Sequence, residues 1–207
     1  MKLIFCSNII YNKKGDFMED KYNIKFYSTI KKLLEVPVKL FFNPVINGLD
    51  NIPDKPYILA GNHKSLWDIP LLITSIPDEI HFMAKKELFD IFILKWMCDM
   101  MGAIPVDRSK VDLKAIKSAL HILKNEEVLG IFPEGTRNKT SKVLLPFKSG
   151  VTSIANRTNS LVVPFGIVGE YKKNKIKLNI GEPTNIKEIS QKETQYIERK
   201  VKELILK

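Results

Sequence analysis

The sequence is poor in residues that cross-link a chain or bind metals. Only two cysteines, Cys6 and Cys98, occur among 207 residues, and neither belongs to a Cys-x-x-Cys motif. This scarcity excludes a disulfide-based fold and fits a reducing compartment. The three histidines, His63, His81 and His121, are scattered without metal-ligand spacing, so we expect no metal site.

Long hydrophobic runs are also missing. No uninterrupted apolar stretch approaches the roughly 18 to 20 residues that a membrane-spanning helix requires. Near the N-terminus the apolar core, Leu3–Phe5, is too short for a signal peptide. The residues before Met18 differ in character from those that follow, so the sequence does not decide between Met1 and Met18 as the natural start.

Positive charge is in excess. Lysine and arginine total 33 against 23 acidic residues, which gives a formal net charge of +10. This balance favours an anionic partner, which can be nucleic acid, an acidic membrane surface or a phosphorylated substrate. A nucleic-acid-binding module would gather its basic residues on one face, with aromatic residues or a helix-turn-helix pattern. The lysines here are spread throughout the chain, so we expect no nucleic-acid partner.

Residues Ile24–Phe42 form the first organised segment. Ile30, Leu33 and Leu34 recur at helical spacing, and Pro37 is expected to interrupt or kink the helix. Four lysines are interleaved with the apolar residues: Lys25, Lys31, Lys32 and Lys39. A basic amphipathic helix of this kind suits the surface of an anionic membrane. The same pattern is equally typical of a terminal helix that packs on its own domain.

Beyond Asn47-Gly48 the pattern becomes that of an α/β domain. Short apolar runs predict strands at Tyr57–Ala60, Ile80–Ala84, Ala103–Val106, Val128–Phe132, Leu161–Val168 and Lys175–Ile180. Helices are predicted between them at Leu66–Thr74, Phe89–Met101, Leu113–Leu123, Gly150–Arg157 and Thr194–Leu206. This alternation predicts a layered helix/sheet/helix domain with a mixed, partly parallel sheet.

The segment Asn62–Asp68 lies where a predicted strand gives way to a helix. Ser65 is expected to be the N-cap of that helix, with Asp68 three positions later as the capping-box acid. Asp68 would then point back toward His63 in the preceding loop. A carboxylate there can accept a hydrogen bond from one imidazole nitrogen and leave the other free as a general base. Alone, this pattern is often only a helix cap beside a loop histidine.

Two further segments offer cations. Gly102–Arg108 is a predicted strand that ends in Arg108, which can clamp a phosphate through two hydrogen bonds. Its neighbour Asp107 is expected to offset part of that charge. Pro146–Gly150 contributes Lys148 just before a helix N-terminus, where an anion is favoured. Taken singly, each cation could also be an ordinary surface charge.

The segment Phe132–Arg137 directly follows a predicted apolar strand. Gly135 allows a tight turn or a close approach of the backbone to a ligand. Glu134 offers an acceptor for a hydroxyl group, and Arg137 offers a donor for a phosphate. The alternative is a plain turn that holds a Glu–Arg ion pair of little energetic consequence.

These blocks occur in a particular order, which is His63-x4-Asp68, Gly102-x-Ile104-x-Val106-x-Arg108, Phe132-Pro133-Glu134-Gly135-Thr136-Arg137 and Val163-Pro164. In this order and at these separations they resemble the four motifs of the glycerolipid acyltransferase family. The nearest members are the 1-acyl-sn-glycerol-3-phosphate (lysophosphatidate) acyltransferases. The likeness runs from about Asn43 to Gly181. One difference is Asn138-Lys139, where Ser-Arg often follows the third motif.

The resemblance implies that an acyl thioester, either acyl-CoA or acyl-[acyl carrier protein], donates a fatty acyl group to the free hydroxyl of lysophosphatidate. The product would be phosphatidate, and no other cofactor is expected. His63 would remove the hydroxyl proton and Asp68 would orient His63, without a covalent acyl-enzyme. The acceptor's phosphate would be bound by Arg108, Arg137 and Lys148. The acceptor and oxyanion region would contain Lys85, Glu134, Gly135 and Thr136.

The resemblance also shapes the expected organisation of the chain. We assign residues 1–42 to an N-terminal extension with a membrane-associating segment and residues 43–207 to an acyltransferase domain. The protein is expected to be monotopic or peripheral, on the cytoplasmic face of a bacterial inner membrane. Two other acceptors stay open, namely glycerol 3-phosphate and another lyso-lipid such as an acylated ornithine. A catalytically silent lipid-binding relative is disfavoured by the intact His63 and Asp68.

Overall fold

The computed structural model describes residues 9–11, 17–19 and 22–207. The short apolar run Leu3–Phe5 and Cys6 therefore lie outside the described residues. Strands β1 (Ile9–Tyr11) and β2 (Phe17–Glu19) form a small antiparallel pair. The rest of the described chain folds around one seven-stranded sheet.

The seven-stranded sheet has the order β3-β9-β8-β4-β7-β5-β6. All neighbouring strands are parallel except β8 and β9, which confirms the predicted mixed sheet. The strands are β3 (Val45–Asn47), β4 (Tyr57–Gly61), β5 (Ile80–Lys85), β6 (Ile104–Val106), β7 (Val128–Ile131), β8 (Leu161–Gly169) and β9 (Ile176–Ile180). Each of the six predicted strands is present, whereas β3 was not predicted because it has only three residues and is partly exposed.

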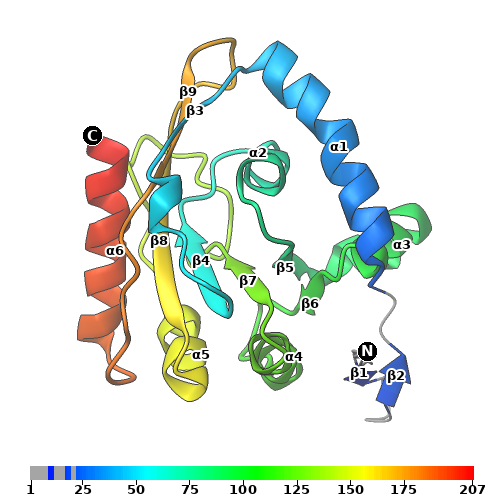
Figure 1. Ribbon diagram of the computed structural model, residues 1–207. Coiled ribbons are helices and arrows are strands. Elements are labelled where there is room, and N and C mark those ends of the chain that lie inside the picture. Colours follow the sequence, from blue (N-terminus) through cyan, green and yellow to red (C-terminus); the bar gives the residue numbers. More distant parts are fainter. Residues whose placement is uncertain (1–8, 12–16, 20–21) are drawn as a thin grey trace.

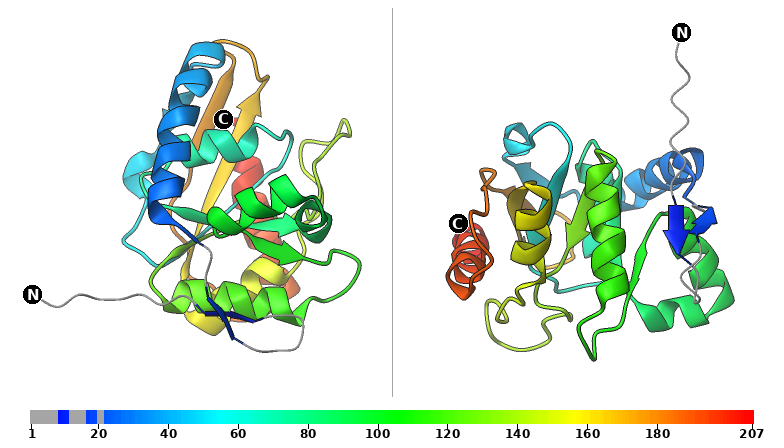
Figure 2. Two further views of the ribbon diagram at one scale, coloured as in Figure 1. Left: turned by 90° about the vertical axis from the view of Figure 1, so that its right-hand side faces the viewer. Right: turned by 90° about the horizontal axis from the view of Figure 1, so that it is seen from below.

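Among the described residues, six α-helices flank the sheet: α1 (Ile24–Phe41), α2 (Asp68–Ser75), α3 (Phe92–Met100), α4 (Leu113–Lys124), α5 (Gly150–Thr158) and α6 (Gln191–Leu206). Helices α1 and α2 pack on one face of the sheet, and α4, α5 and α6 pack on the other (Figure 1). The views in Figure 2 separate these two helical layers. A 3-10 turn, Lys86–Asp90, occupies the start of the helix predicted at Phe89–Met101.

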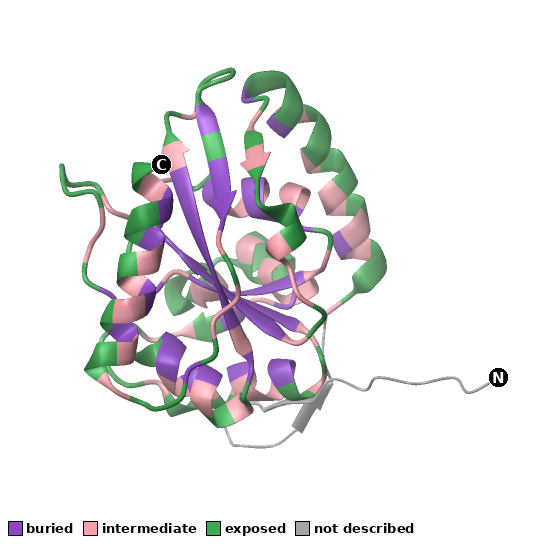
Figure 3. Cartoon of the chain, turned by 60° about the vertical axis from the view of Figure 1, so that its left-hand side comes forward, coloured by how far each residue is buried: buried purple, intermediate pink, exposed green. Residues whose placement is uncertain are grey.

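Residue alternation in β4 explains the layers. Tyr57 and Leu59 belong to the core under α1 and α2, whereas Ile58 and Ala60 belong to the core under α4, α5 and α6. Because successive strand residues point to opposite faces, a strand covered on both sides must be apolar at every position. All five residues of β4 are indeed buried. Figure 3 shows the buried strands between helices that are buried on one side only.

Local signals fix the ends of several helices. The side chain of Asn23 accepts a hydrogen bond from the backbone N–H of Phe26 and caps α1, and Asp112 and Ser190 cap α4 and α6 in the same way. Helix α1 continues through Pro37 to Phe41, so the interruption expected at Pro37 does not occur. Helix α1 packs against the core through its buried residues, which include Tyr27 and Val38.

Strands β4 to β8 are parallel, so their carboxyl ends lie along one edge of the sheet. The predicted motifs follow these ends. Residues 62–68 follow β4, Lys85 ends β5, Arg108 follows β6, and residues 132–137 follow β7. This edge is where ligands bind in open α/β sheets. The topology thus brings together segments that are far apart in the sequence.

Candidate active site

The loop after β4 places a histidine beside a fully buried carboxylate. His63 Nδ1 lies 2.7 Å from Asp68 Oδ2, and the two residues are 7% and 0% exposed. With Nδ1–H donating to the carboxylate, the lone pair of the neutral imidazole is on Nε2. The expected hydrogen bond between His63 and Asp68 is therefore present in the fold, while their roles as a base and its orienting acid stay a prediction.

The local reason for this geometry differs from the one expected. Helix α2 begins at Asp68, and the residue at its N-cap position is Trp67, so the prediction of Ser65 as the N-cap is wrong. Asp68 folds back on its own loop, and Oδ2 accepts the backbone N–H groups of Lys64 at 2.7 Å and Ser65 at 2.8 Å. Asp68 thereby satisfies two backbone N–H groups of the loop that precedes the helix. The helix N-terminus also favours the carboxylate charge.

His63 is held from several directions. Its ring stacks on Phe132, with centroids 4.1 Å apart and planes at 18°. Its backbone N–H donates to Glu134 Oε1 at 2.7 Å, and its carbonyl oxygen accepts from the backbone N–H of Asn138 at 2.7 Å. Both contacts come from the segment after β7, so that segment fixes the histidine independently of Asp68.

Glu134 joins three loops. One carboxylate oxygen accepts the His63 N–H, and the other accepts the backbone N–H of Leu145 at 2.8 Å. Burial raises the pKa of Glu134, which is 4% exposed. Each oxygen of Glu134 thus already holds a backbone group. The side chain brackets the site, while its predicted contact with the acceptor stays a prediction.

Two guanidinium groups lie within electrostatic range of each other. Partial desolvation lowers the pKa of Arg108, nearby Glu87 opposes this shift, and the positive charge of Arg137 adds to it. In the described part of the chain, neither arginine forms a salt bridge. Two neighbouring guanidinium groups that form no salt bridge in the described residues are suited to an anion such as phosphate.

Asp107 does not neutralise Arg108 as expected. Its carboxylate binds Lys86 Nζ at 2.7 Å and accepts hydrogen bonds from the backbone and hydroxyl of Ser109. Lys86 holds the pKa of Asp107 well below its usual range. Asp107 therefore pairs with Lys86 and not with Arg108.

The remaining predicted residues divide into two groups. Lys148 lies against Gly135, where an added Cβ would be 3.0 Å from Lys148 Cε, and the Lys148 N–H donates to Pro133 O at 2.9 Å. Lys148 is thereby brought to the segment that contains Thr136, which is itself exposed. Lys85, by contrast, pairs with Glu87 at 3.4 Å and is half-exposed, so no contact of Lys85 supports the oxyanion role.

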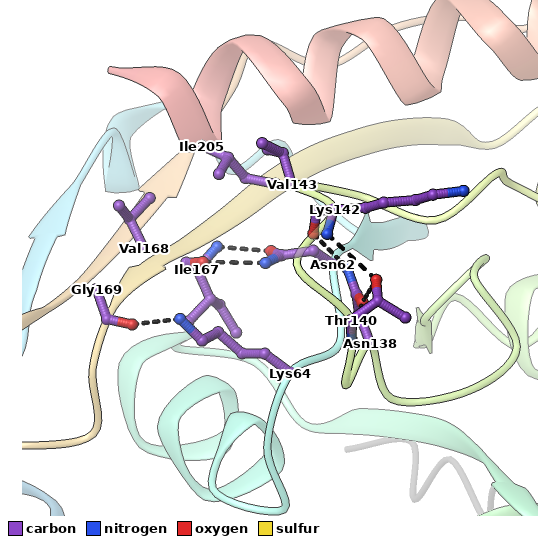
Figure 4. Close-up of a pocket in the computed structure, with 10 residues that line it drawn as sticks. All are labelled: Asn62, Lys64, Asn138, Thr140, Lys142, Val143, Ile167, Val168, Gly169 and Ile205. Atoms are coloured by element: carbon purple, nitrogen blue, oxygen red, sulfur yellow. Dashed lines mark hydrogen bonds between the residues drawn. The ribbon is translucent and has the colours of Figure 1, made fainter.

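Some residues of the site were not predicted. The side-chain amide of Asn62 exchanges two hydrogen bonds with the backbone of Ile167 in β8, and Lys64 Nζ donates to Gly169 O (Figure 4). These contacts fasten the loop after β4 to the end of β8, and Asn62 and Lys64 line a cavity of about 190 Å³ there. The hydroxyl of Tyr171 donates to Asp68 Oδ1. Each of these side chains lies 103 to 105 residues from its partner in the sequence, so no local sequence pattern predicts the contacts.

Comparison with known proteins agrees with this geometry. The family model described as "Acyltransferase" matches residues 43–168, a range that contains all four motifs described above. The chain belongs to the acyltransferase family, which confirms the resemblance drawn from the motifs.

Among curated proteins, the chain is similar to several enzymes that share one name. The chain is 34% identical to the 1-acyl-sn-glycerol-3-phosphate acyltransferase of Bacillus subtilis, over 76% of this chain and 81% of that protein. It is 36% identical to the chloroplastic enzymes of the same name from Brassica napus and Arabidopsis thaliana, over 74% of this chain. The chain spans only 45% and 44% of the length of these two plant relatives.

The fold also matches a solved structure. The crystal structure of the 1-acyl-sn-glycerophosphate (LPA) acyltransferase PlsC from Thermotoga maritima superposes with a TM-score of 0.70 at 32% identity. The match covers 86% of this chain and 79% of that one. The α/β fold of the described residues is therefore the fold of that acyltransferase.

The two hydrogen bonds that Glu134 accepts from the backbone of His63 and Leu145 can be tested by mutation. Glu134→Ala leaves the buried N–H of His63 and the N–H of Leu145 without their acceptor. We expect the free energy of unfolding to fall by about 1–3 kcal/mol, measured by urea denaturation. The matched control Glu188→Ala removes an exposed carboxylate and should change it by less than about 0.5 kcal/mol. Equal stability of the two variants would contradict the claim that Glu134 holds these loops together.

Proposed function

We propose that the protein transfers a fatty acyl group from an acyl thioester to the free hydroxyl of lysophosphatidate, producing phosphatidate. The observation that carries this proposal is the buried His63–Asp68 pair, with 2.7 Å between Nδ1 and Oδ2. It lies on the same sheet edge as Arg108 and Arg137. The names of the relatives from three organisms and of the Thermotoga maritima structure support lysophosphatidate as the acceptor.

In the proposed reaction His63 Nε2 takes the proton from the acceptor hydroxyl while its oxygen attacks the thioester carbonyl. Asp68 stabilises the imidazolium as it forms, because it already accepts the Nδ1–H. A tetrahedral oxyanion results and then collapses, which breaks the carbon–sulfur bond. The imidazolium returns its proton to the leaving thiolate. The products are the new ester and a free thiol, and no acyl-enzyme is needed.

In this proposal, cationic side chains on the same edge of the sheet as His63 bind the phosphate of the acceptor and so orient it. Arg108, Arg137 and Lys148 would bind the phosphate, so that the glycerol hydroxyl lies within reach of His63. Holding both reactants in position supplies much of the rate enhancement of such a transfer. The donor is a thioester of coenzyme A or of acyl carrier protein, and we expect no cofactor besides it. Gly135 and Thr136 would border the glycerol, and Lys85 is kept only as a weaker candidate for the oxyanion region.

The outer side of α1 supports peripheral attachment to a membrane. Lys25, Lys32 and Lys39 recur every seven residues and are exposed, so they form a basic stripe along the helix. Beside them Leu33 and Leu40 are exposed, at 67% and 60%. Each lysine near an anionic bilayer contributes about 1 kcal/mol to attachment, and the leucines would enter the interface.

Helix α3 enlarges this apolar surface. Phe92 is 85% exposed, and Ile93 and Trp96 are also exposed. Trp96 contacts Phe26 of α1 edge-on at 5.0 Å, so the two helices meet. Within the described residues no helix is long and apolar enough to cross a membrane. From the exposed apolar residues of both helices and the basic stripe of α1, we propose that α1 and α3 together rest on a bilayer surface, on its cytoplasmic side.

The role of His63 is tested by His63→Ala. Removing the base should lower acyl transfer to lysophosphatidate by at least about 10²-fold, because general-base catalysis contributes 10²- to 10⁴-fold. The measurement is formation of phosphatidate and free thiol from each thioester by the purified protein. His121→Ala is the matched control, since His121 lies on α4 and bonds to Asn125 there. Activity of His63→Ala close to that of the control would sink the general-base assignment.

The membrane surface is tested by Leu33→Glu on α1. A carboxylate at this position should weaken binding to vesicles that contain anionic lipid, because it opposes both the apolar contact and the lipid charge. Cosedimentation with vesicles measures the effect, which we expect to be roughly tenfold or more. Leu206→Glu on α6 is the control, because Leu206 is equally exposed, at 67%, on the opposite face of the sheet. Equal binding of both variants would remove α1 from the membrane surface.

A further inference from the structure

The buried carboxylate of Asp68 has a different set of partners on each oxygen. Oδ2 accepts hydrogen bonds from His63 Nδ1 and from the backbone N–H groups of Lys64 and Ser65. Oδ1 accepts the hydroxyl of Tyr171, which lies just beyond the end of β8. One oxygen thus serves the catalytic loop, and the other is bound by a distant segment.

The Tyr171 ring is itself held in place. It packs edge-on against Phe42 at 5.2 Å, and Phe42 packs edge-on against Trp67 at 5.0 Å. The carbonyl oxygen of Phe42 accepts the backbone N–H of Asn174 at 2.8 Å, and Asn43 bonds to the side chain of Asn174. The turn after β8 is therefore tied to the end of α1, and the hydroxyl reaches Asp68 from a fixed direction.

We propose that Tyr171 is a positioning residue for the His63–Asp68 pair. A carboxylate can turn about its last side-chain bond, because the torsion there is soft. The backbone N–H groups of Lys64 and Ser65 hold Oδ2, and the hydroxyl of Tyr171 holds Oδ1, so that both ends of the carboxylate are fixed opposite His63 Nδ1. The inference rests on the proposed role of His63 as the base, and it adds a residue that acts on the base through Asp68.

The hydroxyl also shares the charge of the carboxylate. Without it, more negative charge faces the imidazole, and the protonated form of His63 is stabilised. The charged groups near the pair are Glu134, from the segment after β7, and Lys64, whose Nζ is turned to Gly169 O. Glu134 is held by two backbone N–H groups and Lys64 Nζ by Gly169 O, so we expect neither to move when the hydroxyl of Tyr171 is removed. The imidazole should therefore titrate at higher pH than in the wild type, and less neutral base is present on the acid side of the pH profile.

Tyr171→Phe removes only the hydroxyl and keeps the ring against Phe42. Tyr57→Phe is the matched control, because Tyr57 also donates its hydroxyl to a carboxylate, Asp78 Oδ2 at 2.8 Å, at the start of β4. The measurement is an NMR titration of the ring nitrogens of the three histidines in the full chain. Assignment uses the His81→Gln and His121→Gln variants. Initial rates of transfer to lysophosphatidate in vesicles are recorded over the same pH range.

In Tyr171→Phe the titration midpoint of His63 should rise by on the order of 0.5 to 1 pH unit. The acid limb of kcat/KM should move in the same direction, so that the rate at a pH well below the midpoint should fall roughly threefold to tenfold. In Tyr57→Phe we expect the titration midpoint of His63 and the acid limb of kcat/KM to stay unchanged, although the thermal stability of this variant falls. An unmoved midpoint in Tyr171→Phe, or the same movement in Tyr57→Phe, would overturn the positioning role.

The two readouts separate this inference from the proposed function. If the wild-type protein forms no phosphatidate from lysophosphatidate, the proposed function fails, while the titration still decides whether Tyr171 acts on His63. If transfer is observed and the His63 midpoint does not respond to Tyr171→Phe, the function stands and the role of Tyr171 fails.

Discussion

The structure of the site depends on one buried carboxylate. Asp68 is fully buried, and a buried charge is tolerated only when donors surround it. The donors are the imidazole of His63, two loop N–H groups and the hydroxyl of Tyr171. The need to satisfy Asp68 therefore shapes the loop after β4, selects the tautomer of His63, and links the loop to the turn after β8.

Around this carboxylate the sheet supplies the remaining parts. Parallel strands bring His63, Arg108 and Arg137 to one edge, although they are spread over more than a third of the chain. Glu134 then fastens the segment after β7 to the backbone of His63. In the proposed reaction His63 and the cations Arg108, Arg137 and Lys148 have separate roles. The base activates the hydroxyl, and the cations hold the lipid that carries it.

Most of the fold could be predicted because strands covered on both sides appear in the sequence as short apolar runs. Short, partly exposed β3 has no such run and was missed. The motif residues were predicted because the four motifs resemble those of a known family in their order and separation. Ser65 was wrongly predicted as the N-cap, since the sequence does not reveal that Asp68 folds back on its own loop. Tyr171 was missed because it meets Asp68 only through the order of strands in the sheet, at a separation of 103 residues.

The central claim is that a phosphate-bearing acceptor is held beside His63. It is tested most directly by the initial rates at which the purified protein acylates lysophosphatidate and monoacylglycerol of the same chain length, offered together in neutral vesicles. The two acceptors share the free hydroxyl and differ in the phosphate. We expect phosphatidate to form at least about tenfold faster than diacylglycerol, because two charge-assisted contacts are lost with the phosphate. Equal rates would contradict the account.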